Sequence, residues 1–145
     1  MSRWADPCSR SAAVAELLRH SRVEKNMATV LALGLDPACV DTAEFGGFTP
    51  QQVRAFIDAQ LERVRAAGYE VVNCLVTGDT AAAMTEHALK TERFDCVMFG
   101  AGLRAPAQLL LFEKLLNVVH AHAPDAKLCF NSSPADTLEA VRRAI

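Results

Sequence analysis

The sequence predicts an α/β three-layer sandwich, in which a four-stranded parallel sheet of order 2-1-3-4 lies between two layers of helices. Four short apolar segments alternate along the chain with four segments of helical spacing, a pattern typical of βα units. The strand-like segments are apolar almost throughout, as parallel strands covered on both faces are. Right-handed crossovers then place the helices after the first and fourth strands on one face and the other two on the opposite face.

Each predicted strand is followed by a helix with its own start and stop signals. The helix at 49–68 is the best marked: Thr49 is suited to the N-cap, Pro50 fits the first turn, Gln52 completes a capping box and Gly68 ends the helix. The predicted strands are 29–35, 69–76, 95–100 and 126–131, and the other predicted helices are 80–93, 106–123 and 133–144.

The chain of 145 residues is 51% hydrophobic, which suits one domain with a single sizeable core. We assign residues 27–145 to this α/β domain and residues 1–26 to a helical or flexible N-terminal extension. Three interpretations of the extension stay open: a docked amphipathic helix, an upstream segment of a chain that natively begins at Met27, and a targeting segment. Glu16 and Glu24 count against targeting.

Composition excludes several classes of function. The net charge is −2 with acids and bases interspersed, and aromatic residues are few, so we expect no nucleic-acid partner. No apolar run approaches the roughly 20 residues that cross a bilayer, so we expect no membrane association. Cys74, Cys96 and Cys129 fall inside strand-like segments and are expected to be buried free thiols. Reduced thiols and the lack of a secretory signal predict a cytoplasmic protein.

The loops after the four strands are the candidate binding site, because open parallel sheets bind ligands beyond the carboxyl ends of their strands, near the point where strand order reverses. Arg104 and the start of the helix that follows it could hold a carboxylate or phosphate; the alternative is a sharp turn with a solvated arginine. Ser133 is sufficiently explained as an N-cap. The candidate ligand-binding residues are Gly34, Asp36, Gly78, Gly100, Gly102, Arg104, Asn131, Ser132 and Ser133.

The other polar residues of these loops do not form a recognisable catalytic arrangement. Asp36 could bind a cation, act as a base or cap a turn, and Asp79 is expected to be a helix N-cap. The loop 36–48 is long enough to form a flap over the site. None of the strand-end loops contains a histidine that could act as a base for the Cys39 thiol of this loop. His120 and His122 point to different faces of their helix, so they do not form a pair of metal ligands. We therefore predict no catalytic residues, no metal and no cofactor.

The segment "FDCVMFGAGLRAPAQLLLFEKL" resembles the third-strand region of two-component receiver domains, with Asp95, the strand Cys96–Phe99 and Pro106 in the family's outline. The resemblance covers about residues 29–145 and implies a flavodoxin-like or receiver-like fold. The family's phosphate-accepting aspartate corresponds to Gly100, so the resemblance is to a degenerate receiver that takes up no phosphoryl group.

These observations lead to two hypotheses. The first is a non-catalytic binding or interaction module with a degenerate pocket at the strand ends. The second is an enzyme or carrier for a small anionic ligand, such as a phosphate, carboxylate or nucleotide, at the same place. A homodimer is also expected, because apolar residues wrap more than one face of the helix 106–123.

Overall fold

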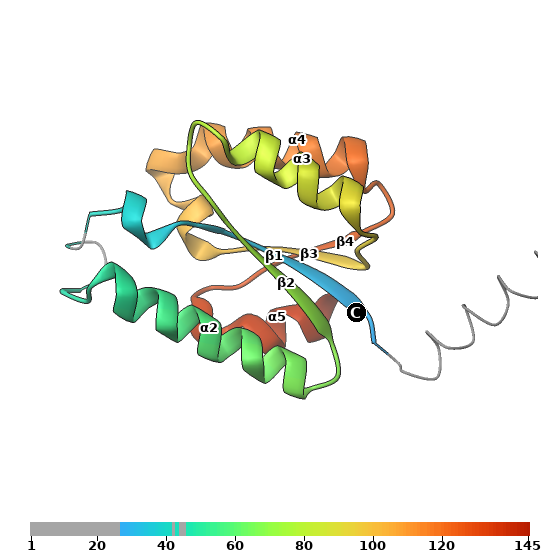
Figure 1. Cartoon of the computed structure of the whole chain (residues 1–145), viewed down its shortest axis with the longest axis horizontal. Helices are drawn as coiled ribbons and strands as arrows, with labels where there is room; N and C mark the ends of the chain where they lie inside the picture. The colour runs from blue at the N-terminus through green and yellow to red at the C-terminus, as the bar shows by residue number, and fades with distance from the viewer. Residues whose placement is uncertain (1–26, 42, 44–45) are drawn as a thin grey trace, which may run out of the picture.

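The computed structural model describes residues 27–41, 43 and 46–145, and the hypotheses for the N-terminal extension lie outside these residues. Strands and helices alternate along this part of the chain (Figure 1). The strands are β1 (Thr29–Leu35), β2 (Glu70–Val76), β3 (Cys96–Phe99) and β4 (Lys127–Phe130), and the α-helices are α2 (Pro50–Ala66), α3 (Ala81–Thr91), α4 (Leu109–His122) and α5 (Thr137–Ala144).

The sheet is parallel throughout and its order is β2-β1-β3-β4, which confirms the predicted fold class. Helices α3 and α4 cover one face, and α2 and α5 cover the other (Figure 1), as right-handed crossovers require. In register, Leu33 of β1 pairs with Cys74 of β2 and with Phe99 of β3. The carboxyl ends of all four strands therefore meet at one edge of the sheet.

Alternate residues of each strand contribute to two separate cores. Leu31 and Leu33 of β1 face α3 and α4, where Phe99 is fully buried and its ring lies 5.5 Å from that of Phe112. Val30 and Ala32 face α2 and α5 on the opposite side. This period of two follows from the pleat of a strand, and it gives each helical layer its own apolar floor.

Helix α2 begins and ends as the sequence predicts. Thr49 and Gln52 form the reciprocal capping box, and Gly68 adopts φ +102° just beyond the helix. Only the C-terminal half of α2 is fully packed, since Leu61 and Val64 are buried, whereas Phe56 is 46% exposed. The N-terminal half of α2 thus leaves apolar surface uncovered on the side of the sheet's carboxyl edge.

Two helix starts and one cap differ from prediction. A separate 3-10 turn, Pro106–Gln108, precedes α4 because the Gln108 amide donates to the Ala105 carbonyl three residues back. A second 3-10 turn, Pro134–Asp136, likewise precedes α5. The N-cap of α3 is Thr80 and not Asp79. The Thr80 hydroxyl lies 2.7 Å from that of Thr77, and the Thr80 amide donates to the Thr77 carbonyl at 3.2 Å.

The three strand cysteines are buried and free, as predicted. The sulfur atoms of Cys96 and Cys129 lie 3.4 Å apart inside the core beneath α5. The hydrogen bond to the Cys129 sulfur and the burial of Cys96 itself raise the pKa of Cys96 far above its usual range. Two thiols shielded in this way act as small apolar side chains that fill the core.

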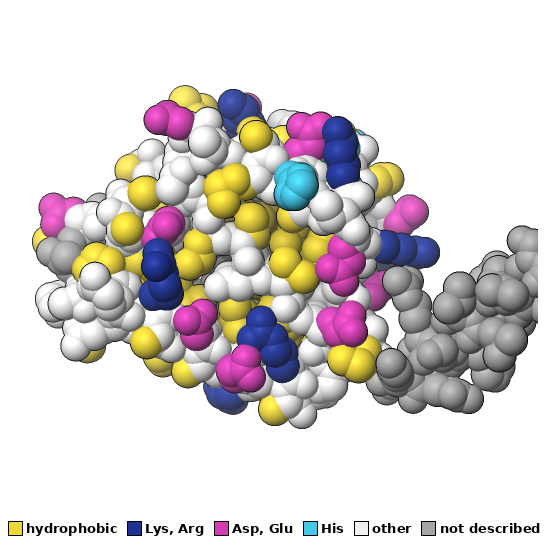
Figure 2. Space-filling model, in the orientation of Figure 1, with side chains coloured by type: hydrophobic (Ala, Val, Ile, Leu, Met, Phe, Trp, Pro, Cys, Tyr) yellow, Lys and Arg dark blue, Asp and Glu magenta, His cyan; other side chains and the backbone are white. Residues whose placement is uncertain are grey.

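The outer surface carries charges of both signs. Lysine, arginine and acidic side chains are interspersed on the face seen in Figure 2. Helix α3 and the sheet partly bury Leu111, Phe112, Leu116 and Val118, whereas Leu109 and Leu110 remain 59% and 78% exposed. None of the helices in the described part of the chain is long and apolar enough to cross a membrane.

Candidate functional site

A cavity of about 1320 Å³ lies between the sheet and the α2/α5 layer and reaches the carboxyl edge of the strands. We call it the strand-end cavity. Three strands contribute to its floor: Ala32 and Gly34 belong to β1, Leu75 to β2 and Met98 to β3. Asn131, directly after β4, completes the floor. The cavity therefore lies where the topology brings the four strand ends together.

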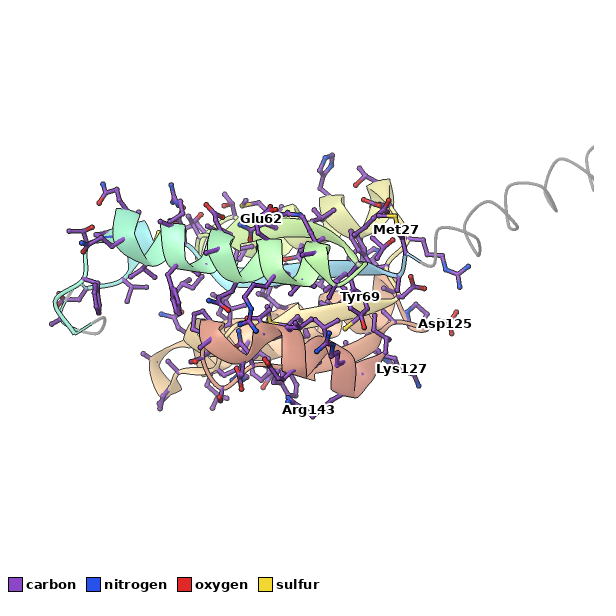
Figure 3. All side chains as sticks on the ribbon, turned by 90° about the horizontal axis from the view of Figure 1, so that it is seen from below. Met27, Glu62, Tyr69, Asp125, Lys127 and Arg143 are labelled. Carbon is purple, nitrogen blue, oxygen red and sulfur yellow. The ribbon has the colours of Figure 1, made fainter. Side chains whose placement is uncertain are left out.

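The opposite wall comes from α2 and from the loop that follows β1. Figure 3 looks onto the α2/α5 layer that covers the cavity. Phe48 and Phe56 line the cavity and are 59% and 46% exposed. The other wall residues from this part of the chain are Pro37, Cys39, Val40, Asp41, Gln52, Val53, Ala55, Ile57 and Leu61. Most of the wall is thus apolar, and its two aromatic side chains are about half exposed.

Small residues on the floor make the space. Four β1 residues belong to the lining. The side chains of Leu33 and Leu35 pack in the core on the opposite face of the sheet, so Ala32 and Gly34 are left on the cavity side, and neither fills the space. At the end of β3, the Gly100 amide donates to the Leu33 carbonyl at 2.8 Å. A Cβ atom at Gly100 would lie 3.2 Å from that carbonyl oxygen, so glycine permits the close approach of the two chain segments.

The structure brings six of the nine sequence-predicted site residues together. Those that line the strand-end cavity are Gly34, Gly100, Gly102, Asn131, Ser132 and Ser133. The remaining three, Asp36, Gly78 and Arg104, are not among its lining residues. These three include Asp36 and Arg104, the two charged residues of the predicted set. The predicted residues that do line the cavity are therefore all uncharged.

Arg104 interacts with the ends of two strands. Its guanidinium donates to the carbonyl oxygen of Phe99 at 2.6 Å and to that of Asn131, and it lies 5.4 Å from the centre of the Phe130 ring. These contacts hold the carboxyl ends of β3 and β4 together. The donors that were predicted for an anion are therefore bonded to the backbone.

Replacing Arg104 by methionine is expected to lower the free energy of unfolding by about 1.5–3 kcal/mol, because the variant loses hydrogen bonds from a charged donor to two carbonyls. Arg104→Lys, which keeps the charge but not the fork, should fall between the methionine variant and the wild type. Urea denaturation followed by circular dichroism measures both. Stability within about 0.5 kcal/mol of the wild type for Arg104→Met would contradict the structural role.

The turn between β4 and α5 is held by the carboxylate of Asp136. Asp136 accepts from the Ser132 amide at 2.9 Å, from the Ser132 hydroxyl at 2.6 Å and from the Ser133 amide at 3.2 Å. The hydrogen bonds from the Ser132 side chain and the backbone amides lower the pKa of Asp136 below its usual value. An external anion at this turn would have to compete with that carboxylate.

Asp136→Asn is expected to destabilise the protein at neutral pH and to have a smaller effect in acid. The folded pKa of Asp136 is lowered, so its contribution is present above the unfolded pKa of about 3.9 and is lost as the pH falls through the lower folded value. Unfolding curves of both proteins between neutral pH and acid provide the comparison. A difference that stays constant over the whole series would rule out the carboxylate as its source.

Asp36 caps a turn, which is one of the three roles that the sequence leaves open for it. Its carboxylate accepts from the Ala38 amide at 3.0 Å, at the start of the 3-10 turn Pro37–Cys39, and from Arg54 of α2 at 2.6 Å. The ion pair connects the loop after β1 to α2, beside the cavity. Asp36 thus positions the cavity wall.

Asn131 is the most unusual polar residue in the lining. It is 4% exposed, and its amide nitrogen donates to the Thr137 hydroxyl at 3.1 Å. That hydroxyl donates in turn to the Pro134 carbonyl at 2.7 Å. The Asn131 side-chain oxygen is buried and, among the residues that the structure describes, has no hydrogen-bond partner. Buried acceptors are rarely left unpaired.

Sequence reasoning missed the α2 wall and the floor residues Ala32, Leu75 and Met98. The apolar stripe of α2, which includes Val53 and Ile57, has the same spacing in a packed helix as in one that lines a cavity. The usable signal was the pair Ala32 and Gly34, small residues that share one face of the central strand. Asn73, on the adjacent strand, lines the same cavity.

Among residues 27–41, 43 and 46–145, no group of three or more His, Cys, Asp or Glu side chains is arranged to hold a metal ion. Neither a protein-family model nor a curated protein matches the chain. We therefore base the functional proposal on the strand-end cavity and the residues that line it.

Proposed function

We propose that this protein is a non-catalytic binding module whose small-molecule ligand occupies the strand-end cavity. The observation that carries the proposal is the cavity itself, with a volume of about 1320 Å³ and a mostly apolar wall. It exceeds the range of roughly 300–1,000 Å³ that is usual for ligand sites. Its place, beside the point where strand order reverses between β1 and β3, is the general ligand position of open α/β sheets.

The side chains in the lining favour binding over catalysis. Apart from Asp41 and the Cys39 thiol, the polar side chains among the described lining residues are the neutral amides and hydroxyls of Gln52, Asn73, Gln108, Asn131, Ser132, Ser133 and Thr137. General acid–base and nucleophilic catalysis need a titratable group beside its partner. No histidine or lysine is among these lining residues to accompany Cys39 or Asp41.

An enzyme or carrier for a small anion is the second candidate. Its support is the position of Ser132, Gly100 and Gly102 in the lining, at strand ends where phosphates and carboxylates often bind. Against it, Arg104 is bonded to backbone carbonyls, and Asp136 accepts from the Ser132 and Ser133 amides in the turn before α5. The first candidate therefore has the stronger support.

Thermal unfolding of the full chain with a panel of compounds tests the proposal. The panel contains inorganic phosphate, nucleotides, small carboxylates and neutral apolar molecules. A ligand at 100 times its Kd adds about 2.7 kcal/mol to stability, which raises Tm by several degrees. We expect neutral compounds to raise Tm; a rise with the anions alone would favour the second candidate. No rise with any class at millimolar concentration would contradict binding in the cavity.

We also infer that the protein forms a homodimer through the N-terminal end of α4. Leu109 and Leu110 are exposed there, whereas the other large apolar residues of the helix are buried or partly buried in the core on this face of the sheet. Burying such a side chain contributes about 1.5–3 kcal/mol before association costs. Leu110→Glu should raise the dimer Kd at least tenfold in sedimentation equilibrium, whereas Ala59→Glu, at an exposed position of α2, adds the same charge and should not. A wild type that stays monomeric at micromolar concentration would exclude the dimer.

A further inference from the structure

The charge of the strand-end cavity is unsuited to an anion. Asp41 is the single charged residue among the described residues that line it, and no lysine, arginine or histidine accompanies Asp41 there. A bound anion would lose its water without gaining a cationic partner, and it would face the Asp41 carboxylate. The lining therefore favours an uncharged ligand.

The shape of the wall favours an apolar ligand. Phe48 and Phe56 expose large parts of their rings, on the side of the cavity opposite Leu75 and Met98. A flat apolar molecule between these surfaces would cover the rings and displace water from both walls. Binding of this kind is driven by the removal of apolar surface from water.

Asn131 supplies a polar group of fixed orientation. The hydrogen of the Thr137 hydroxyl is donated to Pro134, so this hydroxyl can only accept from Asn131, which must present its NH₂ group there. The amide oxygen of Asn131 is then turned away from Thr137. Because Arg104 also holds the Asn131 carbonyl, both the backbone and the side chain of Asn131 are restrained before any ligand binds.

The missing partner of the Asn131 oxygen has to be a donor. The oxygen is shielded from solvent and unpaired among the described residues, and Asn131 is one of the residues that line the cavity. An N–H or O–H group in the cavity reaches this oxygen when the side chains that shield it move aside. Such a group would satisfy an acceptor whose burial otherwise costs stability.

We propose that the strand-end cavity selects an uncharged, largely apolar molecule with one N–H or O–H donor, and that this donor binds the Asn131 side-chain oxygen. The proposal rests on the binding function proposed above and names the chemical class of its ligand. Asn131 is thereby a specificity-determining residue, and the aromatic wall supplies the larger part of the contact surface.

Indole and benzofuran test the proposal, because they share one shape and differ in the N–H donor. Their Kd values for the full chain are measured by NMR titration of the backbone amide signals. We expect indole to bind at least tenfold more tightly than benzofuran, and benzoate, a flat anion, to bind more weakly than either. Asn131→Leu should abolish the preference for indole while benzofuran still binds; if that variant does not fold, the ratio measured on the wild type decides.

Each contrary result has a separate meaning. Equal Kd values for indole and benzofuran would overturn the role of Asn131 and leave the binding function standing. Tighter binding of benzoate would overturn the uncharged class. If none of the three binds at millimolar concentration, both this inference and the proposed function fail.

Discussion

Replacing Phe99 by alanine is expected to lower the free energy of unfolding by about 3–5 kcal/mol, the usual cost of removing a buried aromatic ring. Phe99 is fully buried at the end of β3, and its ring lies 5.5 Å from that of Phe112 and 5.8 Å from that of Phe130. Alanine would leave a void bordered by both rings. Urea denaturation monitored by circular dichroism measures the loss.

Phe130→Ala is the control for this prediction. Phe130 belongs to the same aromatic group but is 41% exposed at the edge strand, so less apolar surface returns to water and the loss should be clearly smaller. Since domains of this size are stable by only about 5–15 kcal/mol, Phe99→Leu serves if the alanine variant does not fold. Equal losses for Phe99→Ala and Phe130→Ala would show that the aromatic core is not centred on Phe99.

Ala32→Leu and Ala140→Leu are expected to change stability differently, although both enlarge a buried alanine in the core beneath α2 and α5. Ala140 does not line the cavity and is fully buried, so added methyl groups should overpack the core and cost about 1–3 kcal/mol. Ala32 lines the cavity floor. A leucine there should enter free space, and stability should stay within about 0.5 kcal/mol of the wild type or rise.

The variants Ala32→Leu and Ala140→Leu also test whether ligands bind in the strand-end cavity. A leucine at Ala32 occupies space that a ligand needs, so any compound that raises Tm in the wild type should have a smaller effect in this variant. Ala140→Leu should retain the full effect if it folds. A loss at Ala32→Leu as large as that at Ala140→Leu would indicate that the space beneath α2 is closed in solution.

The sequence is sufficient for the fold because each element carries local signals that agree with the global pattern. Continuous apolar strands, the Thr49–Gln52 capping box and Gly68 each depend on neighbours along the chain, and the handedness of crossovers then determines the sheet order. The helix starts near Pro106 and Ser133 were less predictable. There the choice between a 3-10 turn and an α-helix depends on single hydrogen bonds such as Gln108 to Ala105.

The candidate site could be located from the sequence but not characterised. Strand ends converge in any parallel sheet, so Gly34, Gly100 and Asn131 were predictable as neighbours. The partner of Arg104 was not predictable. In the structure its guanidinium donates to two backbone carbonyls, and no sequence pattern distinguishes such an arginine from one that binds a ligand. Nor does the spacing of Val53, Phe56 and Ile57 reveal that their half of α2 is incompletely packed.

The most direct test of the strand-end cavity as a binding site is the methionine-methyl NMR spectrum of the full chain with and without benzene. Met98 lies on the cavity floor and is 5% exposed, whereas Met84 on α3 is 38% exposed on the opposite layer and serves as an internal control. Apolar cavities take up benzene, whose ring current shifts nearby methyl signals. We expect a saturable shift of the Met98 signal with Met84 unmoved. A Met98 signal that stays in place, or one that moves no more than Met84, would contradict it.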